Sequence, residues 1–462
     1  MKYLMKQTFI SKITLTIVLF IGLLSQAQTK KWTLEECVDY AIKNNISIKQ
    51  SELDAKSAAI EKSAAIGNFL PSFNINGSHS WNIGLNQNIT TGLLENQTTQ
   101  FTSAGINSNV AIYNGMQNQN RLRRANLAIV ASKFQLSKMK DDISLNIANA
   151  YLQILFNKEN LKVQKEQLSN NEKQLLRSQE LVNAGVVPRG DLLDIKATVA
   201  TNNQAIVTAE NALLISKLSL AQLLQLDNFQ DFDVAETNYD AKESSTLLQT
   251  PESIFAKAKE ERVELKIAKT NLEIAERDLK IAKGAYQPSL QGFYSLNTRA
   301  GYSDRVIGFN GTTPILAPAL PVFTQFDNNK GHSFGLQMNI PLLNGFSVRN
   351  NVDRSKIAYD RSKIAFSQQE LDLERSVFTA FTDAKGAMKA NESAIITLEA
   401  RQEAYAYAKE KFAVGMLNAF DLNQSQTLFV NAQSEVVRTK YDYIFRVKVI
   451  EFYFGIPIIK KQ

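Results

Sequence analysis

The sequence Ala184-Gly185-Val186-Val187-Pro188-Arg189-Gly190-Asp191-Leu192 recurs 230 residues later as Val414-Gly415-Met416-Leu417-Asn418-Ala419-Phe420-Asp421-Leu422. Upstream, Tyr113-Asn114-Gly115 recurs as Leu343-Asn344-Gly345 at the same offset. Leu70-Pro71-Ser72 and Gln287-Pro288-Ser289 match at an offset of 217, so one half carries a longer insert. Chance matches would not keep one register, and self-similarity of this kind indicates a duplicated unit.

Each unit is predicted to run helix, strand, strand, long helix, turn and helix. Thr33 and Glu36 form a capping box that begins the first helix. A helix over 46–68 stops before Pro71, a very long one spans about 116–184, and Gly185 and Pro188 separate it from a return helix over 191–226. In the second half Ile357, Ile364, Leu371 and Phe378 are seven residues apart, which is typical of a coiled-coil seam.

The long helix contains neither proline nor glycine, and at about 1.5 Å per residue it forms a rod of roughly 100 Å. A rod of this length cannot bury itself in a globule. We therefore expect it to pack sideways against other helices, including those of other chains.

Four segments alternate apolar and polar residues, as strands do: about 72–85, 102–112, 289–297 and 332–341. From Phe73 to Leu85 the odd positions are mainly apolar and the even positions are Asn, Ser and Gly. Such runs are long enough to cross a bilayer when tilted, and the uncharged polar face suits a water-filled lumen. A half-buried soluble sheet alternates as well and remains the alternative. The polar or Gly/Pro-rich segments 86–101 and 298–331 are predicted to be exposed loops at one end.

Four strands cannot close a water-filled barrel, and open strand edges are not tolerated in lipid. If these strands span a membrane, several chains must share one barrel. Three copies give twelve strands, so the predicted fold is mainly α with a small β part: a trimeric helical barrel capped by a twelve-stranded transmembrane β-barrel.

The beginning of the sequence is typical of a secretory signal peptide. Three lysines precede an apolar stretch over 13–24, and Ser25-Gln26-Ala27 ends in small residues, so we expect a signal peptide over 1–27. An uncleaved anchor is the alternative. Residues 28–226 and 251–462 then form the two repeats, joined by the segment 227–250. No later stretch reaches 18 apolar residues, which excludes a transmembrane helix in the mature protein.

Composition excludes several classes of function. The chain has one cysteine and two histidines, so a disulfide framework and cysteine-based zinc sites are ruled out. A net charge of +7 arises from 52 basic and 45 acidic residues, which is a mixed surface rather than a nucleic-acid-binding one. The sequence has no nucleophile elbow, no zinc-protease motif and no phosphate-binding glycine loop. We expect neither an enzyme nor a cofactor.

Together, the helical opening 32–41, the Pro-Ser strand entries, the Asn-Gly strand exits and the two turns resemble the TolC family of outer-membrane efflux ducts. The resemblance covers about Trp32 to Pro457. It implies a homotrimer in outer-membrane lipid with a long periplasmic extension. It also implies a passive exit duct, fed by an inner-membrane pump of the RND or ABC class through a periplasmic adaptor (membrane fusion) protein. The acidic segment from Asp227 fits the family's equatorial region, although a solvated linker fits equally well.

The family places the two turns at the periplasmic mouth. The resemblance implies adaptor-contacting tips and a constricted aperture lined by aspartates, of which Asp421 is one. Gln424 stands where the better-studied members have a second aspartate, Leu417 stands where they have a gating arginine, and Arg189 is a candidate replacement for that arginine. Each aspartate also suits a helix N-terminus, a role compatible with the first. The expected tip residues are Gly185, Val186, Val187, Gly415, Met416 and Leu417; the expected aperture residues are Asp421, Gln424, Asp191, Asp194 and Arg189.

An exported soluble coiled-coil scaffold or adaptor is the alternative function. Adaptors also contain helical hairpins, but this chain lacks a compact Gly-rich β-domain between paired hairpin halves.

Overall fold

The computed structural model describes residues 31–87, 92–236 and 244–457, so the predicted signal peptide lies outside the described residues. The chain forms two compact units, each built from separate stretches of sequence. The helical unit contains the described residues of 1–52, 136–263 and 370–462, and the strand unit contains those of 53–135 and 264–369. Each unit therefore takes residues from both sequence repeats.

The helices confirm the duplication. Helices α2 (Leu34–Asn44) and α6 (Pro251–Glu261) have 11 residues each, and α3 (Ile46–Gly67) and α7 (Val263–Gly284) have 22 each. Helices α4 (Gln117–Asn183) and α9 (Ser347–Ala413) have 67 each, whereas α5 (Arg189–Leu224) has 36 and α10 (Ala419–Tyr453) has 35. Their start positions keep the offsets of 217 and 230 residues seen in the sequence. Thr33 and Glu36 form the predicted capping box.

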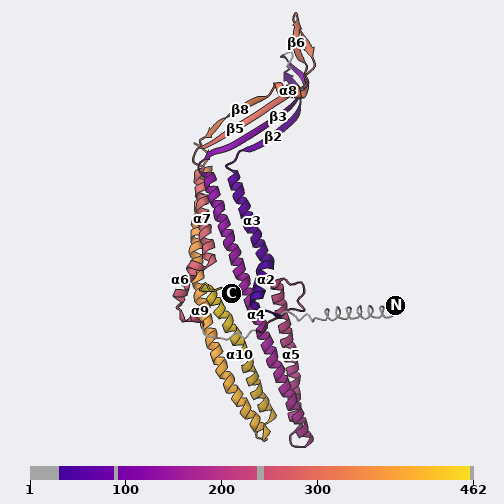
Figure 1. The fold of residues 1–462 in the computed structure, drawn as a ribbon, viewed down its shortest axis with the longest axis vertical. Helices are drawn as coiled ribbons and strands as arrows, with labels where there is room; N and C mark the ends of the chain where they lie inside the picture. The colour runs from indigo at the N-terminus through magenta and orange to yellow at the C-terminus, as the bar shows by residue number, and fades with distance from the viewer. Residues whose placement is uncertain (1–30, 88–91, 237–243, 458–462) are drawn as a thin grey trace, which may run out of the picture. The chain divides into compact units, whose positions relative to one another are not determined.

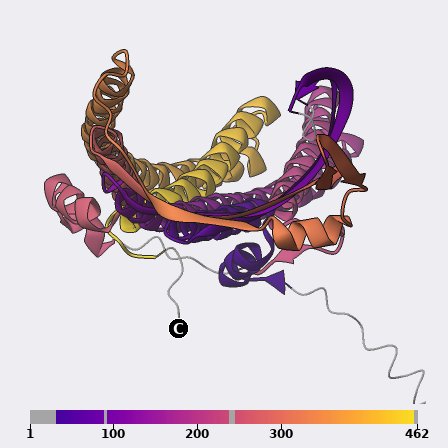
Figure 2. The same ribbon diagram turned by 90° about the horizontal axis from the view of Figure 1, so that it is seen from above.

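The main sheet of the strand unit is antiparallel, with its strands in the order β2-β3-β5-β8 (Figure 1). Its strands are β2 (Ser72–Gln87), β3 (Leu94–Asn114), β5 (Ser289–Gly301) and β8 (Gly331–Asn339). The two hairpins have the same register, because Ile75 pairs with Ile106 and the corresponding residues Gly292 and Leu336 also pair. Seen from above, the strands follow a curve rather than a plane (Figure 2).

The two faces of the sheet differ in chemistry, as the alternation predicts. One face carries the row Ile75, Ile106 and Leu296, whose members are register partners on neighbouring strands. The opposite face carries linked polar side chains. There Asn107 Nδ2 donates to Asn76 Oδ1 at 2.7 Å, and Ser295 Oγ donates to Asn107 Oδ1 at 2.6 Å. The sheet therefore presents one apolar and one uncharged polar surface.

The strands extend further than predicted, and the two expected loops are largely structured. β2 reaches Gln87 and β3 already begins at Leu94, so much of 86–101 is strand. The segment 298–331 contains the β6 (Arg305–Asn310) and β7 (Thr313–Ala317) hairpin and helix α8 (Val322–Asn328). Polar residues such as Asn96, Thr98 and Thr99 read as loop, but cross-strand pairing outweighs local propensity.

Helix α8 covers the part of the β5 edge that extends beyond β8. Gln325 Oε1 accepts a hydrogen bond from the Gly301 amide at 2.9 Å, and Gln325 Nε2 donates to the Gly301 carbonyl at 2.8 Å. One side-chain amide thus replaces a neighbouring strand. This contact satisfies backbone groups that an edge would otherwise leave unpaired.

The core of the helical unit lies around the two shortest strands. β1 (Lys31–Trp32) pairs in parallel with β4 (Asp233–Val234). Val234 of β4 is fully buried, and so are Tyr151 and Leu224 in the same core cluster. The short helix η1 (Ser245–Leu248) follows β4 in the chain. Across the described residues, no helix is apolar over a stretch long enough to cross a membrane.

Candidate functional site

The two turns have the same backbone geometry. Gly185 and Gly415 have φ values of +73° and +74°. After each glycine the next amide reaches back over the helix end: Val186 N donates to Leu181 O and Met416 N donates to Lys411 O, both at 2.9 Å. This is a Schellman-type ending, which needs a left-handed residue and explains glycine at both positions. Val186 and Met416 are 68% and 75% exposed, so each turn ends in an apolar tip.

The predicted aperture residues begin the two return helices. Asp191 and Asp421 lie in the first turns of α5 and α10, and the Asp421 amide donates to Asn418 Oδ1 at 2.8 Å. Asp194, Asp421 and Gln424 are exposed and Asp191 is half-buried. Arg189 is exposed and forms no ion pair within the described chain. The aspartates have the geometry of helix N-terminal residues, where the dipole favours negative charge, and their role at an aperture stays a prediction.

Behind the turns, buried polar and aromatic contacts join the helices of this unit. Gln426 on α10 donates to Asn171 on α4 at 2.5 Å, and both side chains are 2% exposed. Tyr405 on α9 stacks on Phe429 with ring centres 5.5 Å apart, and its burial raises the pKa of the Tyr405 phenol. A buried hydrogen bond between amides specifies one helix register, because any slip leaves both groups unpaired.

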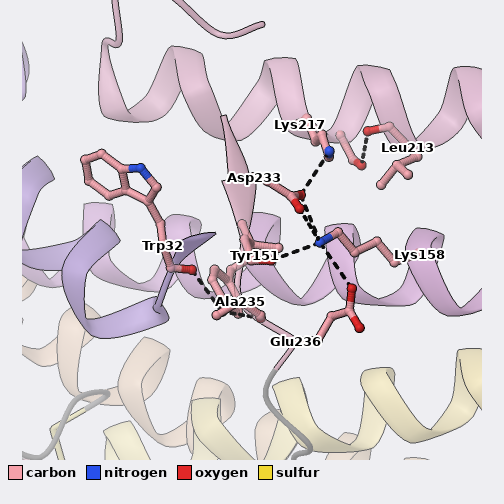
Figure 3. Close-up of polar contacts among 10 residues, drawn as sticks. Trp32, Tyr151, Lys158, Leu213, Lys217, Asp233, Ala235 and Glu236 are labelled. Atoms are coloured by element: carbon pink, nitrogen blue, oxygen red, sulfur yellow. Dashed lines mark hydrogen bonds and ion pairs between the residues drawn. The ribbon is translucent and has the colours of Figure 1, made fainter. Parts of the chain in front are cut away.

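A charged cluster surrounds β4 (Figure 3). Lys158 Nζ donates to Asp233 Oδ2 and to the Val234 carbonyl, both at 2.9 Å, and Lys217 Nζ lies 2.9 Å from Asp233 Oδ1. Burial opposes ionisation of Asp233, but the two ammonium groups outweigh it and hold the pKa of this carboxyl below its ordinary value. Glu236 Oε1 lies 3.7 Å from Lys158 Nζ and brings the cluster to two cations and two anions.

Tyr151 on α4 holds the end of β4 through its hydroxyl group. Its hydroxyl donates to the Ala235 carbonyl at 2.8 Å and lies 3.3 Å from the Trp32 carbonyl, so it bridges the ends of β1 and β4 (Figure 3). Tyr151 lies on the apolar face of the long helix with Ile147 and Ile154, and its neighbours in the sequence give no sign of this polar role. The one available signal was the alternation of Phe232, Asp233 and Val234, which marks a short strand inside the acidic segment.

A groove of about 830 Å³ runs beside the cluster and is lined by Lys158, Lys162, Glu159, Leu213 and Tyr441 among others. The cations and carboxylates at β4 are paired with each other. Within the described ranges no three His, Cys, Asp or Glu side chains gather as metal ligands would.

Comparison with known protein families gives a match in both halves of the chain. The family described as outer membrane efflux protein matches residues 37–225 and 254–449, which is most of the chain. The chain belongs to the outer membrane efflux protein family. The two matched stretches correspond to the two repeats and leave out the segment around β4 and η1.

Named relatives and solved structures agree with the family. Outer membrane protein TolC of Vibrio cholerae is 22% identical over 376 residues, covering 78% of this chain and 79% of that protein. TolC of Escherichia coli K12 is 22% identical over 430 residues, covering 91% and 81%. The crystal structure of VceC from Vibrio cholerae has a TM-score of 0.76 at 13% identity, covering 91% of this chain and 96% of that one. The Campylobacter jejuni CmeC channel gives 0.73 at 18% identity, covering 91% and 85%.

This family member is therefore an efflux channel of the outer membrane, with its long helices in the periplasm. The family is one of channels and not of enzymes.

Proposed function

We propose that three copies of the chain form a passive exit duct, each contributing four strands to a shared barrel and its helices to a periplasmic tunnel. The observation that carries this proposal is the open sheet: β2 and β8 are its outer strands, and each has one edge without a partner among the described strands. In lipid such edges must be paired, and a neighbouring copy of the same chain supplies the missing strand.

Exposed apolar residues support the same arrangement. Helix α3, which leads into β2, carries Leu53 and Ile60 at heptad spacing, 62% and 70% exposed. Helix α9, which follows β8, carries Ile357 and Ile364 at the same spacing, 56% and 70% exposed. A heptad stripe is a coiled-coil seam, so both flanks of the strand unit are suited to another helix.

The partners follow from the apolar face of the sheet and from the two exposed turns. We propose that the apolar sheet face contacts outer-membrane lipid, and that the tips at Val186, Val187, Met416 and Leu417 meet the helical hairpin of a periplasmic adaptor. Through the adaptor, an inner-membrane RND or ABC transporter would supply the substrates. Residues 28–226 and 251–462 act as the two repeats, and 227–250 as the equatorial linker that β4 anchors to the helical unit.

The test is the mass of the particle extracted from outer membranes in detergent, with the detergent mass subtracted. Three chain masses are expected, about three times the 51.6 kDa of the full sequence before removal of any signal peptide. A monomer, or a protein released without detergent, would instead support the soluble scaffold.

A ring of Asp421 at the aperture has its own test. Three like charges in a narrow pore repel one another and attract cations. The variant Asp421→Ala is therefore expected to raise single-channel conductance in planar bilayers and to weaken block by multivalent cations. Glu403→Ala is the matched control, since it removes one exposed carboxylate from α9 at a position that is not among the expected aperture residues. Unchanged current and block in Asp421→Ala would exclude the ring.

A further inference from the structure

We propose that a pocket at one end of the sheet's polar face binds an organic anion with an apolar body, whose acidic group is held by Arg299 and Arg305. The pocket lies where β5, β6 and α8 meet (Figure 1). The proposal rests on the duct, because the duct places the polar face in the lumen. It adds the class of solute that this part of the lumen holds.

The pocket has the size of a small-molecule site. Its volume is about 430 Å³, within the range of about 300–1,000 Å³ that such sites occupy. All of its lining residues belong to the strand unit of one chain. The lining includes Phe101, Arg299, Arg305, Val306, Leu320 and Gln325. Binding here therefore needs a folded chain but no particular arrangement of its neighbours.

Charged side chains are rare on the strands that lead to this pocket. Strands β2 and β8 contain no Asp, Glu, Lys or Arg, β3 contains Glu95 alone, and β5 contains Arg299 alone. Arg299 lies four residues after Ser295 on β5 and therefore belongs to the same polar face. It is the one cation that the polar face of these four strands presents. Three copies of it in a lumen would attract anions.

Phe101 holds the Arg299 side chain in place. The Arg299 Cζ atom lies 4.8 Å from the centre of the Phe101 ring, which is a cation–π distance. Phe101 pairs in register with Gly301, where an added Cβ atom would meet the ring at 3.7 Å, so the ring lies against a residue without a side chain. A guanidinium that stacks by its face keeps the N–H groups at its edge available. Their planar fork matches a carboxylate or phosphate group.

The charge balance of the pocket favours an anion. Arg305 is the second cation of the lining, and neither arginine forms an ion pair with a residue that the structure describes. Asp304 is the only carboxylate among the described lining residues, so cations outnumber anions. Asp327 does not line the pocket and is paired with Lys330, whose Nζ lies 2.5 Å from its Oδ1. An acidic group that enters the pocket thus meets a net positive charge.

The uncharged walls decide which kind of anion fits. Val306, Ala319 and Leu320 line the pocket together with the Phe101 ring. Covering such apolar surface is favourable for a ligand that brings apolar surface of its own. An aromatic or aliphatic acid therefore uses both parts of the pocket, whereas inorganic phosphate uses only the arginines. Because Phe101 and Arg299 belong to the polar face, the ligand reaches the pocket from water and not from lipid at the opposite face.

Binding of 1-naphthoate to the particle extracted in uncharged detergent tests the pocket. We expect one site per chain by isothermal titration calorimetry, and binding about tenfold weaker in Arg299→Gln and in Arg305→Gln, since each variant loses charge-assisted hydrogen bonds. The cation 1-naphthylmethylammonium has the same rings and should bind more weakly than 1-naphthoate. Arg349→Gln is the matched control and should bind normally, because Arg349 is an exposed arginine of the same unit that does not line the pocket.

Two results of the binding experiment would overturn the proposal. If 1-naphthoate bound both glutamine variants as strongly as the unchanged protein, the anion would lie elsewhere. If phosphatidylglycerol displaced 1-naphthoate, the arginines would serve a lipid headgroup and not a solute of the lumen. The variant Arg299→Lys keeps the charge but loses the planar fork, so we expect its affinity to lie between those of Arg299→Gln and the unchanged protein.

Currents in planar bilayers distinguish a failure of this proposal from a failure of the duct. We expect 1-naphthoate to reduce the current of the unchanged channel at concentrations that leave Arg299→Gln conducting, and Arg299→Gln to shift the reversal potential in a KCl gradient towards cation selectivity. A channel whose block and selectivity are the same in Arg299→Gln would refute the place of the pocket in the lumen and leave the duct intact. A particle that forms no channel would refute the duct, while calorimetry would still decide whether the pocket binds the anion.

Discussion

Lysine in place of Ile106 is expected to remove the protein from the outer membrane as an assembled channel. Ile106 lies midway along the alternating part of β3 and belongs to the apolar face, between Ile75 and Leu296. A lysine facing lipid near the bilayer midplane costs about 2–4 kcal/mol. A trimer bears that cost in three copies, which is comparable to the whole stability of a typical domain. The measurement is the amount of channel extracted from outer membranes.

The matched control lies three residues away on the same strand. Asn109 belongs to the polar face and is exposed, so Asn109→Lys places the same charge where we expect water. This variant should assemble at the normal level, and its three added cations should shift ion selectivity in planar bilayers towards anions. If both variants assembled equally well, the assignment of the two faces to lipid and lumen would be wrong.

Most of the fold could be predicted because the signals are local and repeated. Helix ends depend on short-range chemistry, as at Thr33 with Glu36 and at Gly185 and Gly415, so sequence alone places them well. The alternation of the strands also fixes which residues share a face. Since the two halves obey one pattern, each prediction had a second copy with which it had to agree.

The features that sequence reasoning missed depend on partners far apart in the chain. Lys158, Lys217 and Asp233 lie on three different elements. The residues around each of them in the sequence do not indicate that the two lysines form ion pairs with this aspartate. The sequence predicts a loop where helix α8 lies, because the contact that stabilises this helix joins residues distant in sequence. The side-chain amide of Gln325 forms two hydrogen bonds with the backbone of Gly301, as a neighbouring strand would. At the two turns, the structure gives the positions of Asp421 and Arg189 within one chain. An aperture is formed by several chains together, so the role of these residues there stays a prediction.

The variant Gly115→Val is expected to prevent the chain from folding. Gly115 has a φ of +67°, where a β-branched residue is strained, and its Cβ atom would overlap the Gly284 carbonyl. Left-handed strain costs roughly 1–2 kcal/mol and overpacking about 1–3 kcal/mol more. The nearest atoms belong to the Gly284 backbone, which cannot move away by a change of rotamer as a side chain could. The amount of intact chain, measured after expression, should fall, and Gly284→Val should act in the same way.

Comparing valine variants at Gly67 and at Gly284 distinguishes an effect on folding of the chain from an effect on assembly of the trimer. Gly67 corresponds to Gly284, has an ordinary backbone and faces open space in the single chain, so Gly67→Val should leave each chain folded. If the subunit junction repeats the internal one, this valine meets Gly345 of the partner subunit and only the trimer is lost. Gly386→Ala is the control, because this α9 glycine also faces open space and alanine is the better helix former. Normal trimers from Gly67→Val would mean that the two junctions differ, since a backbone contact as close as that of Gly115 and Gly284 leaves no room for a side chain.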